Sequence, residues 1–206
     1  MSFLNKISYF QNRKDAVPNQ ELAKELTETK NKKGIREIAE NLWNENKNIQ
    51  SDCIKVLYEI GYIDPKLIGN YTEDFLKLIE SRINRLVWGG MIALSTIAKL
   101  KADKLFPHFE EIKKVIENGS VITVDSGILT LSKIASAKME YNERIFPYLL
   151  ELLKTCRPKS VAMYSEFVFD AVNEKNRTGF IEVLNKRKEY LNPNQVKRVE
   201  KLLGKF

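Results

Sequence analysis

The sequence predicts an all-α superhelix in which about five helix pairs stack in a row behind a leading N-terminal helix. Two observations support this prediction. The stretch GMIALSTIAKL at 90–100 returns as GILTLSKIASA at 127–137, and both copies contain Leu-Ser-x-Ile-Ala. Apolar residues along the chain recur at i, i+3, i+4 and i+7, the spacing of amphipathic helices. Patterns typical of strands are essentially absent.

The repeated stretch identifies a period of 37 residues, which leads back to SDCIKVLYEIG at 51–61. Two positions can be followed through all three copies, a small residue (Cys53, Gly90, Gly127) and a leucine (Leu57, Leu94, Leu131). A period of this length made of two helices indicates a solenoid whose stacked neighbours bury a shared core. The small residue is expected to let two helix backbones approach closely, since a helical glycine without that benefit costs about 1 kcal/mol.

The first helices of the array follow from local patterns. A leading helix is expected over 19–30, capped by Asn19. The next apolar stripes place helices over 34–46 and 51–61, with Trp43 expected in the core. The second helices of the next two pairs are expected over 85–98 and 121–135.

The later helices are expected to slip out of the 37-residue register. Phe-Pro pairs at 106–107 and 146–147 are expected to mark helix starts, because proline fits the first turn of a helix. These pairs lie 40 residues apart, which predicts three extra residues in the loop near 138–143. Helices follow over 160–172, 178–191 and 194–206, the last with a buried stripe of Val196, Val199 and Leu203.

The composition is that of one helical array over 1–206. We expect an N-terminal segment with the leading helix (1–32), repeats (33–174) and a basic capping pair (175–206). With 43% apolar residues the chain can bury a substantial core, and its apolar runs are too short to span a bilayer. The N-terminal sequence lacks the pattern of a secretory signal, and the two cysteines lie too far apart in sequence to suggest a disulfide framework. A cytoplasmic location is therefore expected.

The stretches RLVWGGMIALSTIA, VITVDSGILTLSKIA and IFPYLLELLK resemble HEAT repeats, which belong to the armadillo-type α-helical superhelices. In that pattern a first helix beginning near proline is followed by a second with a small residue and Leu-x-x-Ile. The resemblance covers roughly 33–190 and implies an architecture, since such arrays serve very different tasks. Divergence in the first and last copies is expected of capping repeats.

Residues that could carry chemistry are few, so catalysis is not expected and neither a cofactor nor a metal is predicted. His108 is the only histidine and is expected at the surface, while Cys53 and Cys156 lack a histidine or CxxC partner. HEAT-like bacterial DNA alkylation-repair proteins show a weaker similarity and carry an aspartate near a tryptophan. Trp88 and Trp43 are not followed by that aspartate, so no catalytic residue is transferred.

Trp88 and Arg85 are the first candidate binding residues. The position of Trp88 holds Ser51 and Asp125 in the neighbouring copies, both polar, so an exposed tryptophan that anchors a partner is expected. The alternative is that Trp88 packs over the seam between repeats. Arg85 lies three residues earlier, on the same side of the helix.

The C-terminal pair supplies the other candidates. From Lys175 to Phe206 there are nine basic and three acidic residues, so most of the net charge of +7 falls there. The candidates in this region are Lys186, Arg187, Lys197, Arg198 and Lys201. Such a charged face is most often a solubilising cap, and the alternative is contact with phosphates or an acidic partner.

The function predicted from these features is that of a non-catalytic scaffold. Its partner is expected to be a protein, bound on a concave surface lined by the second helix of each pair. The alternative is a nucleic-acid-binding or DNA-repair protein that uses the basic C-terminal surface. No membrane partner is predicted.

Overall fold

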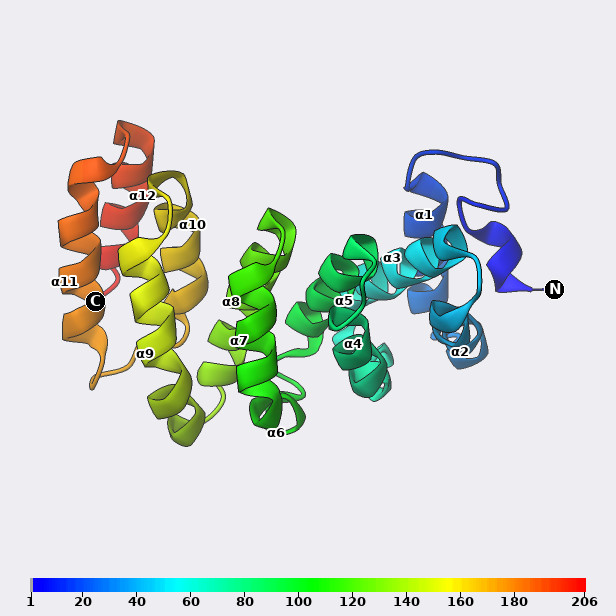
Figure 1. Ribbon diagram of the computed structural model, residues 1–206, viewed down its shortest axis with the longest axis horizontal. Helices are drawn as coiled ribbons and strands as arrows, with labels where there is room; N and C mark the ends of the chain where they lie inside the picture. Colours follow the sequence, from blue (N-terminus) through cyan, green and yellow to red (C-terminus); the bar gives the residue numbers. More distant parts are fainter. Residues whose placement is uncertain (1) are drawn as a thin grey trace.

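A computed structural model describes residues 2–206, in which α-helices form two rows along a curved array (Figure 1). The inner row consists of α1 (Val17–Glu28), α3 (Lys47–Ile63), α5 (Asn84–Ile97), α8 (Val121–Ala135), α10 (Pro158–Phe169) and α12 (Pro193–Leu203). The outer row consists of α2 (Lys32–Glu40), α4 (Thr72–Ile79), α7 (Phe109–Asn118), α9 (Met139–Thr155) and α11 (Arg177–Arg187), and the short α6 (Ala102–Leu105), which contacts α8, leads into α7. With α6 and α7 counted as one interrupted helix, this is the predicted leading helix and five pairs. No strand occurs within residues 2–206.

The 37-residue register continues to the end of the repeats. The inner helices α3, α5, α8 and α10 begin at residues 47, 84, 121 and 158, each 37 after the last. The outer segments that begin at 65, 102 and 139 keep the same interval. The predicted insertion of three residues near 138–143 is therefore wrong.

The two Phe-Pro pairs caused this error because they occupy different places in their repeats. Pro107 lies in η5 (Phe106–His108), the short 3-10 turn that joins α6 to α7. Pro147 lies inside α9, which runs unbroken through the equivalent region. In the 37-residue register Phe146 matches Phe109, and both side chains are buried. Phe146 thus enters the core while Pro147 is exposed, and this pair does not start a helix.

The predicted close approach of helices occurs at the small position. A Cβ atom on Gly90 would lie 2.9 Å from Cβ of Leu78 and 3.1 Å from the carbonyl oxygen of Phe75, both in α4. A Cβ atom on Gly127 would collide with Ile116 of α7. The absence of a side chain therefore lets α5 and α8 press against their outer helices.

The fourth copy departs from this rule. Its small position holds Tyr164, which is buried in α10. α10 makes only limited contact with its outer neighbours α9 and α11, whereas α4 and α7 lie closely on α5 and α8. The Tyr164 hydroxyl instead donates to Asp125 of α8 at 2.7 Å, so this side chain contacts the neighbouring inner helix.

The leucine position faces the shared core as predicted. Leu57, Leu94 and Leu131 are fully buried, and the core continues from Ile7 near the N-terminus to Leu202 in α12. The stripe expected on the last helix is partly wrong. Val199 and Leu202 are buried, whereas Val196 and Leu203 are only half-buried, because α12 packs against α10 on one side.

The leading helix begins two residues earlier than predicted, and Asn19 does not cap it. α1 starts at Val17 after Ala16, so Asn19 lies within the first turn and is buried. Its Oδ1 accepts a hydrogen bond from the Ser8 amide at 2.9 Å, and its Nδ2 donates to Asp52 of α3 at 2.9 Å. Asn19 therefore joins the N-terminal segment to the inner row.

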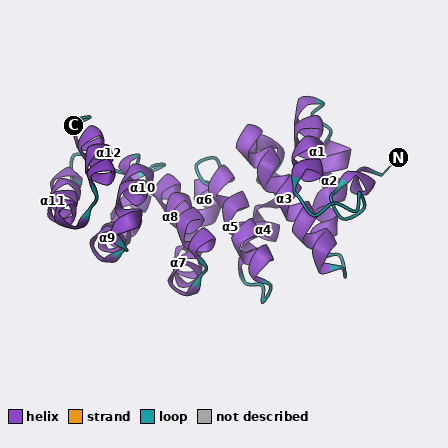
Figure 2. Cartoon of the chain, turned by 90° about the horizontal axis from the view of Figure 1, so that it is seen from above, coloured by secondary structure: helices purple, strands orange, loops and turns teal. Residues whose placement is uncertain are grey.

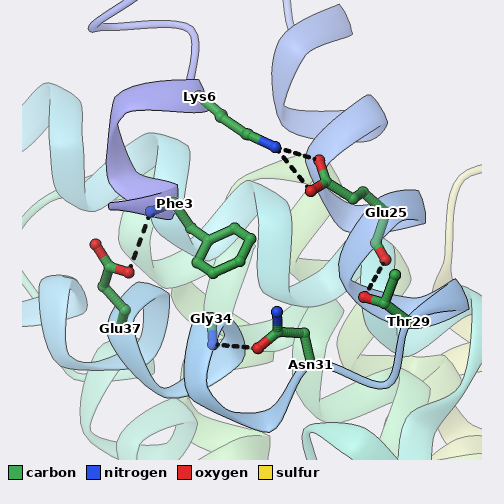
Figure 3. A network of polar contacts seen from close by, with 7 residues as sticks. All are labelled: Phe3, Lys6, Glu25, Thr29, Asn31, Gly34 and Glu37. Atoms are coloured by element: carbon green, nitrogen blue, oxygen red, sulfur yellow. Dashed lines mark hydrogen bonds and ion pairs between the residues drawn. The ribbon is translucent and has the colours of Figure 1, made fainter. Parts of the chain in front are cut away.

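A second polar network holds the start of the chain against α2 (Figure 3). Glu37 accepts hydrogen bonds from the backbone amides of Phe3, at 3.1 Å, and Leu4. Lys6 forms an ion pair with Glu25 at 2.7 Å. Gly34 leaves room for the Phe3 ring, since a Cβ atom there would lie 2.9 Å from it. These contacts close the N-terminal end of the array.

The buried leucines give the first testable prediction. Replacement of Leu131 by alanine removes a fully buried side chain and is expected to lower the free energy of unfolding by about 2–5 kcal/mol. Leu100, which is 46% exposed, is the matched control, and its replacement by alanine is expected to change stability by less than about 0.5 kcal/mol. Urea denaturation measures both. Equal losses would show that the 37-residue register does not define the core.

Candidate functional site

The inner row lines the concave side of the array. In Figure 2 the helices from α12 through α8 and α5 to α1 trace a curve that opens upward, with α11, α9, α7, α4 and α2 outside it. Successive residues of a helix are turned by about 100°. Gly90 faces the outer helix α4, so the opposite side of α5 faces the concave surface.

The 37-residue register carries these positions to the other repeats and defines a surface that we call the inner stripe. On α5 and the turn after it, the residues opposite Gly90 are Arg85, Trp88, Ile92, Thr96 and Lys99. The equivalent sets are Asn48, Ser51, Lys55, Glu59 and Tyr62 at α3, Ile122, Asp125, Leu129, Lys133 and Ser136 at α8, and Lys159, Ala162, Glu166, Asp170 and Asn173 at α10. All of these except Ile92 and Ala162 are at least partly exposed, as a solvent-facing surface requires.

The N-terminal end of the inner stripe contains a hollow of about 740 Å³ between the segment 8–16, α3 and α5. Trp88 and Arg85, which the sequence analysis selected together, both line it. The Trp88 ring is half-buried, with its centroid 6.3 Å from that of Tyr58. The ring is therefore less exposed than expected and packs over the seam between repeats, as in the alternative, while it still forms a wall of the hollow.

Within residues 2–206, some polar groups around this hollow are bound by other residues of the chain, and Arg85 is not. Asp52 accepts a hydrogen bond from the Tyr9 amide at 2.7 Å as well as from Asn19, and Asp15 pairs with Arg13 at 2.9 Å. Arg85 forms no ion pair with any described residue. The hollow therefore offers an aromatic wall beside an unused guanidinium.

Trp43, predicted in the core, is in fact half exposed. It ends η2 (Asn41–Trp43), on the outer side of the array, with 50% of its surface accessible. Its indole N–H donates to Asp74 of α4 at 3.1 Å. The adjacent Leu42 enters the core in its place.

The basic candidates of the C-terminal pair do not form one surface. Lys186 and Arg187 lie on α11 of the outer row and line a smaller hollow of about 390 Å³ beside α9. The other three, Lys197, Arg198 and Lys201, lie on α12 of the inner row. No contact brings either group to the hollow of Trp88.

Two of these candidates bind other parts of the chain. Arg187 donates hydrogen bonds to the carbonyl oxygens of Lys154, at 2.7 Å, and Cys156, at the end of α9. Arg198 makes a two-pronged ion pair with Glu166 of α10. Lys197 and Lys201 are exposed and form no ion pair within residues 2–206. The two arginines thus hold the last helices together.

The groups considered for chemistry lie apart from one another. Burial raises the pKa of the Cys53 thiol and, to a smaller degree, that of half-buried Cys156. His108 is half-buried and its Nδ1 lies 2.7 Å from Glu111. Among residues 2–206 there is no group of three or more side chains able to hold a metal ion. In the same part of the chain, no helix combines the length and apolar character of a membrane span.

The sequence is matched by no protein-family model and by no curated protein sequence. Several solved structures do match. An engineered protein gives a TM-score of 0.69 at 16% identity over 99% of this chain and 96% of its own. A designed armadillo repeat protein in complex with the peptide (KR)4 gives a TM-score of 0.71 at 15% identity over 98% and 90%. A structure of computationally designed armadillo repeat proteins for modular peptide recognition gives a TM-score of 0.64 at 15% identity, over 90% of this chain and 86% of its own.

The fold is a HEAT/armadillo-type helical repeat. The likeness spans nearly the whole chain, and at these identities it concerns architecture alone. The armadillo-type repeat fold explains why the inner stripe is continuous, since each inner helix contacts the next one in the row.

The C-terminal arginines give the second prediction. Arg187→Met removes two charge-assisted hydrogen bonds to α9 and is expected to lower stability by about 1.5–3 kcal/mol. The exposed neighbour Lys186 is the control, and Lys186→Met is expected to leave stability nearly unchanged. Thermal and urea unfolding report the difference. If both variants unfold like the wild type, Arg187 is not a structural residue.

Proposed function

We propose that this protein is a binding scaffold whose concave surface holds an extended segment of a partner protein. The inner stripe presents equivalent positions on α3, α5, α8 and α10 at intervals of 37 residues. Neighbouring repeats thus offer similar positions side by side, which suits a polypeptide whose side chains also follow at regular spacing. Two structures of similar fold are described as a peptide complex and as designs for peptide recognition, which supports this proposal.

The observation that carries the proposal is the hollow beside Trp88. Tryptophan and arginine are enriched among the residues that supply most of the binding energy at protein interfaces. Trp88 is held by its contact with Tyr58, so little side-chain freedom is lost when a partner packs on the ring. Arg85 is exposed and free to donate to a carboxylate or a backbone carbonyl of the same partner.

The C-terminal candidates receive a different role. Because Arg187 and Arg198 bind α9 and α10, we assign them to the fold. Lys186, Lys197 and Lys201 are assigned to the solvated surface of a capping pair, which a solenoid needs at its end. The comparisons lend no support to the nucleic-acid alternative.

Selection from a displayed random-peptide library tests the proposed function. Peptides enriched on the wild-type protein are expected to lose about 30-fold or more in affinity for Trp88→Ala, as for an interface hot spot. Arg85→Ala, at an exposed position, is expected to weaken the same peptides by about tenfold without loss of stability. Fluorescence anisotropy of labelled peptides measures both.

Trp43→Ala is the matched control, since it removes an exposed tryptophan from the outer side of the array. It is expected to leave peptide affinity unchanged. Failure to enrich any peptide, or equal binding by the wild type and both Trp88→Ala and Arg85→Ala, would refute the proposed function.

A further inference from the structure

Most carboxylates of the inner stripe are engaged within the chain. Glu59 forms an ion pair with Lys55 one turn earlier. Asp125 accepts a hydrogen bond from the Tyr164 hydroxyl at 2.7 Å. Glu166 is held by both nitrogens of the Arg198 fork. Among the described residues, Asp170 is the one carboxylate of the inner stripe without a hydrogen bond or ion pair.

The basic groups of the inner stripe show the opposite pattern. Within residues 2–206, four of the five have no carboxylate within 4.0 Å, namely Arg85, Lys99, Lys133 and Lys159. Lys55 is the exception, through Glu59. The concave surface therefore has unused cationic donors beside mostly occupied acceptors.

Lys133 is the most unusual of these cations because it is half-buried. Its ammonium group donates one hydrogen bond, to the carbonyl oxygen of Ser95 on α5 at 2.8 Å. An ammonium has three donors, so two remain for other acceptors. Burial lowers the pKa of Lys133, and the nearby charge of Asp170 opposes this shift. A charged group held partly out of water in this way is stabilised by an anionic partner.

Lys55 shows how the same surface satisfies a cation when the chain supplies the acid. Lys55 and Glu59 stand one turn apart on α3, and their side chains are 19% and 20% exposed. On α8 the residue one turn before Lys133 is Leu129, which offers no acceptor. In the 37-residue register Leu129 stands at the position of Lys55 and Lys133 at that of Glu59, so α8 carries a cation where α3 carries the acid.

We propose that the concave surface selects an acidic segment of the partner protein, one carboxylate of which binds the ammonium of Lys133. This inference rests on the proposed function and specifies its ligand. The pair would be charge-assisted and partly shielded from water, the setting in which such hydrogen bonds are strong. Arg85, at the hollow, is placed to bind a second acidic side chain.

A polypeptide fits this surface better than a nucleic acid does. Asp125, Glu166 and Asp170 alternate with the basic residues along the inner stripe. A continuous row of phosphates would meet these carboxylates and be repelled, because like charges placed opposite one another oppose association. In an extended peptide alternate side chains point to opposite sides, so acidic ones can face Lys133 and Arg85 while others turn to solvent.

Three labelled octapeptides test the charge selection on the intact protein. The acidic peptide (DE)4 is expected to bind, while its neutral counterpart (NQ)4 and the basic (KR)4 are expected to bind at least tenfold more weakly. Lys133→Met is expected to weaken (DE)4 by about tenfold or more, and Lys133→Arg to retain most of the affinity. Asp170→Asn is expected to strengthen binding, since it removes the nearest competing charge.

Lys77→Met is the matched control, because Lys77 is an exposed lysine on the outer helix α4 and forms no ion pair within residues 2–206. It is expected to leave (DE)4 affinity unchanged. Equal binding of (DE)4 and (NQ)4, or equal effects of Lys77→Met and Lys133→Met, would overturn this inference. A short DNA duplex that binds more tightly than (DE)4 and depends equally on Lys133 would overturn it in favour of a nucleic acid.

The two proposals fail in different ways. Library-selected peptides that depend on Trp88 but carry no acidic residues would leave the proposed function standing and refute the acidic ligand. Loss of all peptide binding would refute both. Circular dichroism melting of Lys133→Met separates a binding effect from unfolding, because a methionine of similar length keeps the packing of the lysine stem.

Discussion

The close contact of α5 and α8 with their outer partners α4 and α7 determines how the rest of this array is arranged. At Gly90 and Gly127 the outer helices α4 and α7 lie where a larger side chain would have to be, so the rotation of α5 and α8 about their axes is set by packing. Once that side of the helix faces outward, the opposite side must face the concave surface. The inner stripe is therefore a consequence of core packing.

Side chains one repeat apart complete the structure that this packing begins. Asn19 reaches Asp52, Lys133 reaches Ser95 and Arg187 reaches Lys154, each across 33 to 38 residues of sequence. Contacts of this separation are those of neighbouring repeats in a solenoid. They tie the N-terminal segment and the last pair to the array, and they also decide which polar groups remain free on the concave surface.

The distribution of free and occupied charges gives that surface its character. Asp125 and Glu166 are bound by side chains of the next repeat and Glu59 by Lys55 of its own helix, while within residues 2–206 the cations Arg85 and Lys133 have no carboxylate partner. The pairing of individual charged side chains therefore says more about this surface than the net positive charge of the chain does. The basic C-terminal pair was expected to be a solubilising cap or, alternatively, a contact for phosphates or an acidic partner, and two of its arginines, Arg187 and Arg198, bind α9 and α10.

The sequence by itself determined the helical class, the 37-residue period, the leading helix with five pairs, and the buried leucines, because these depend on local periodicity and on packing that repeats. It also singled out Trp88, which differs from its neighbours in the period, and Arg85, which lies three residues earlier on the same side of the helix. Only the tertiary structure decided the roles of Asn19, Trp43 and Lys133. Their partners lie one repeat away, and which side chains meet across that distance depends on how the helices stack, which no local pattern encodes.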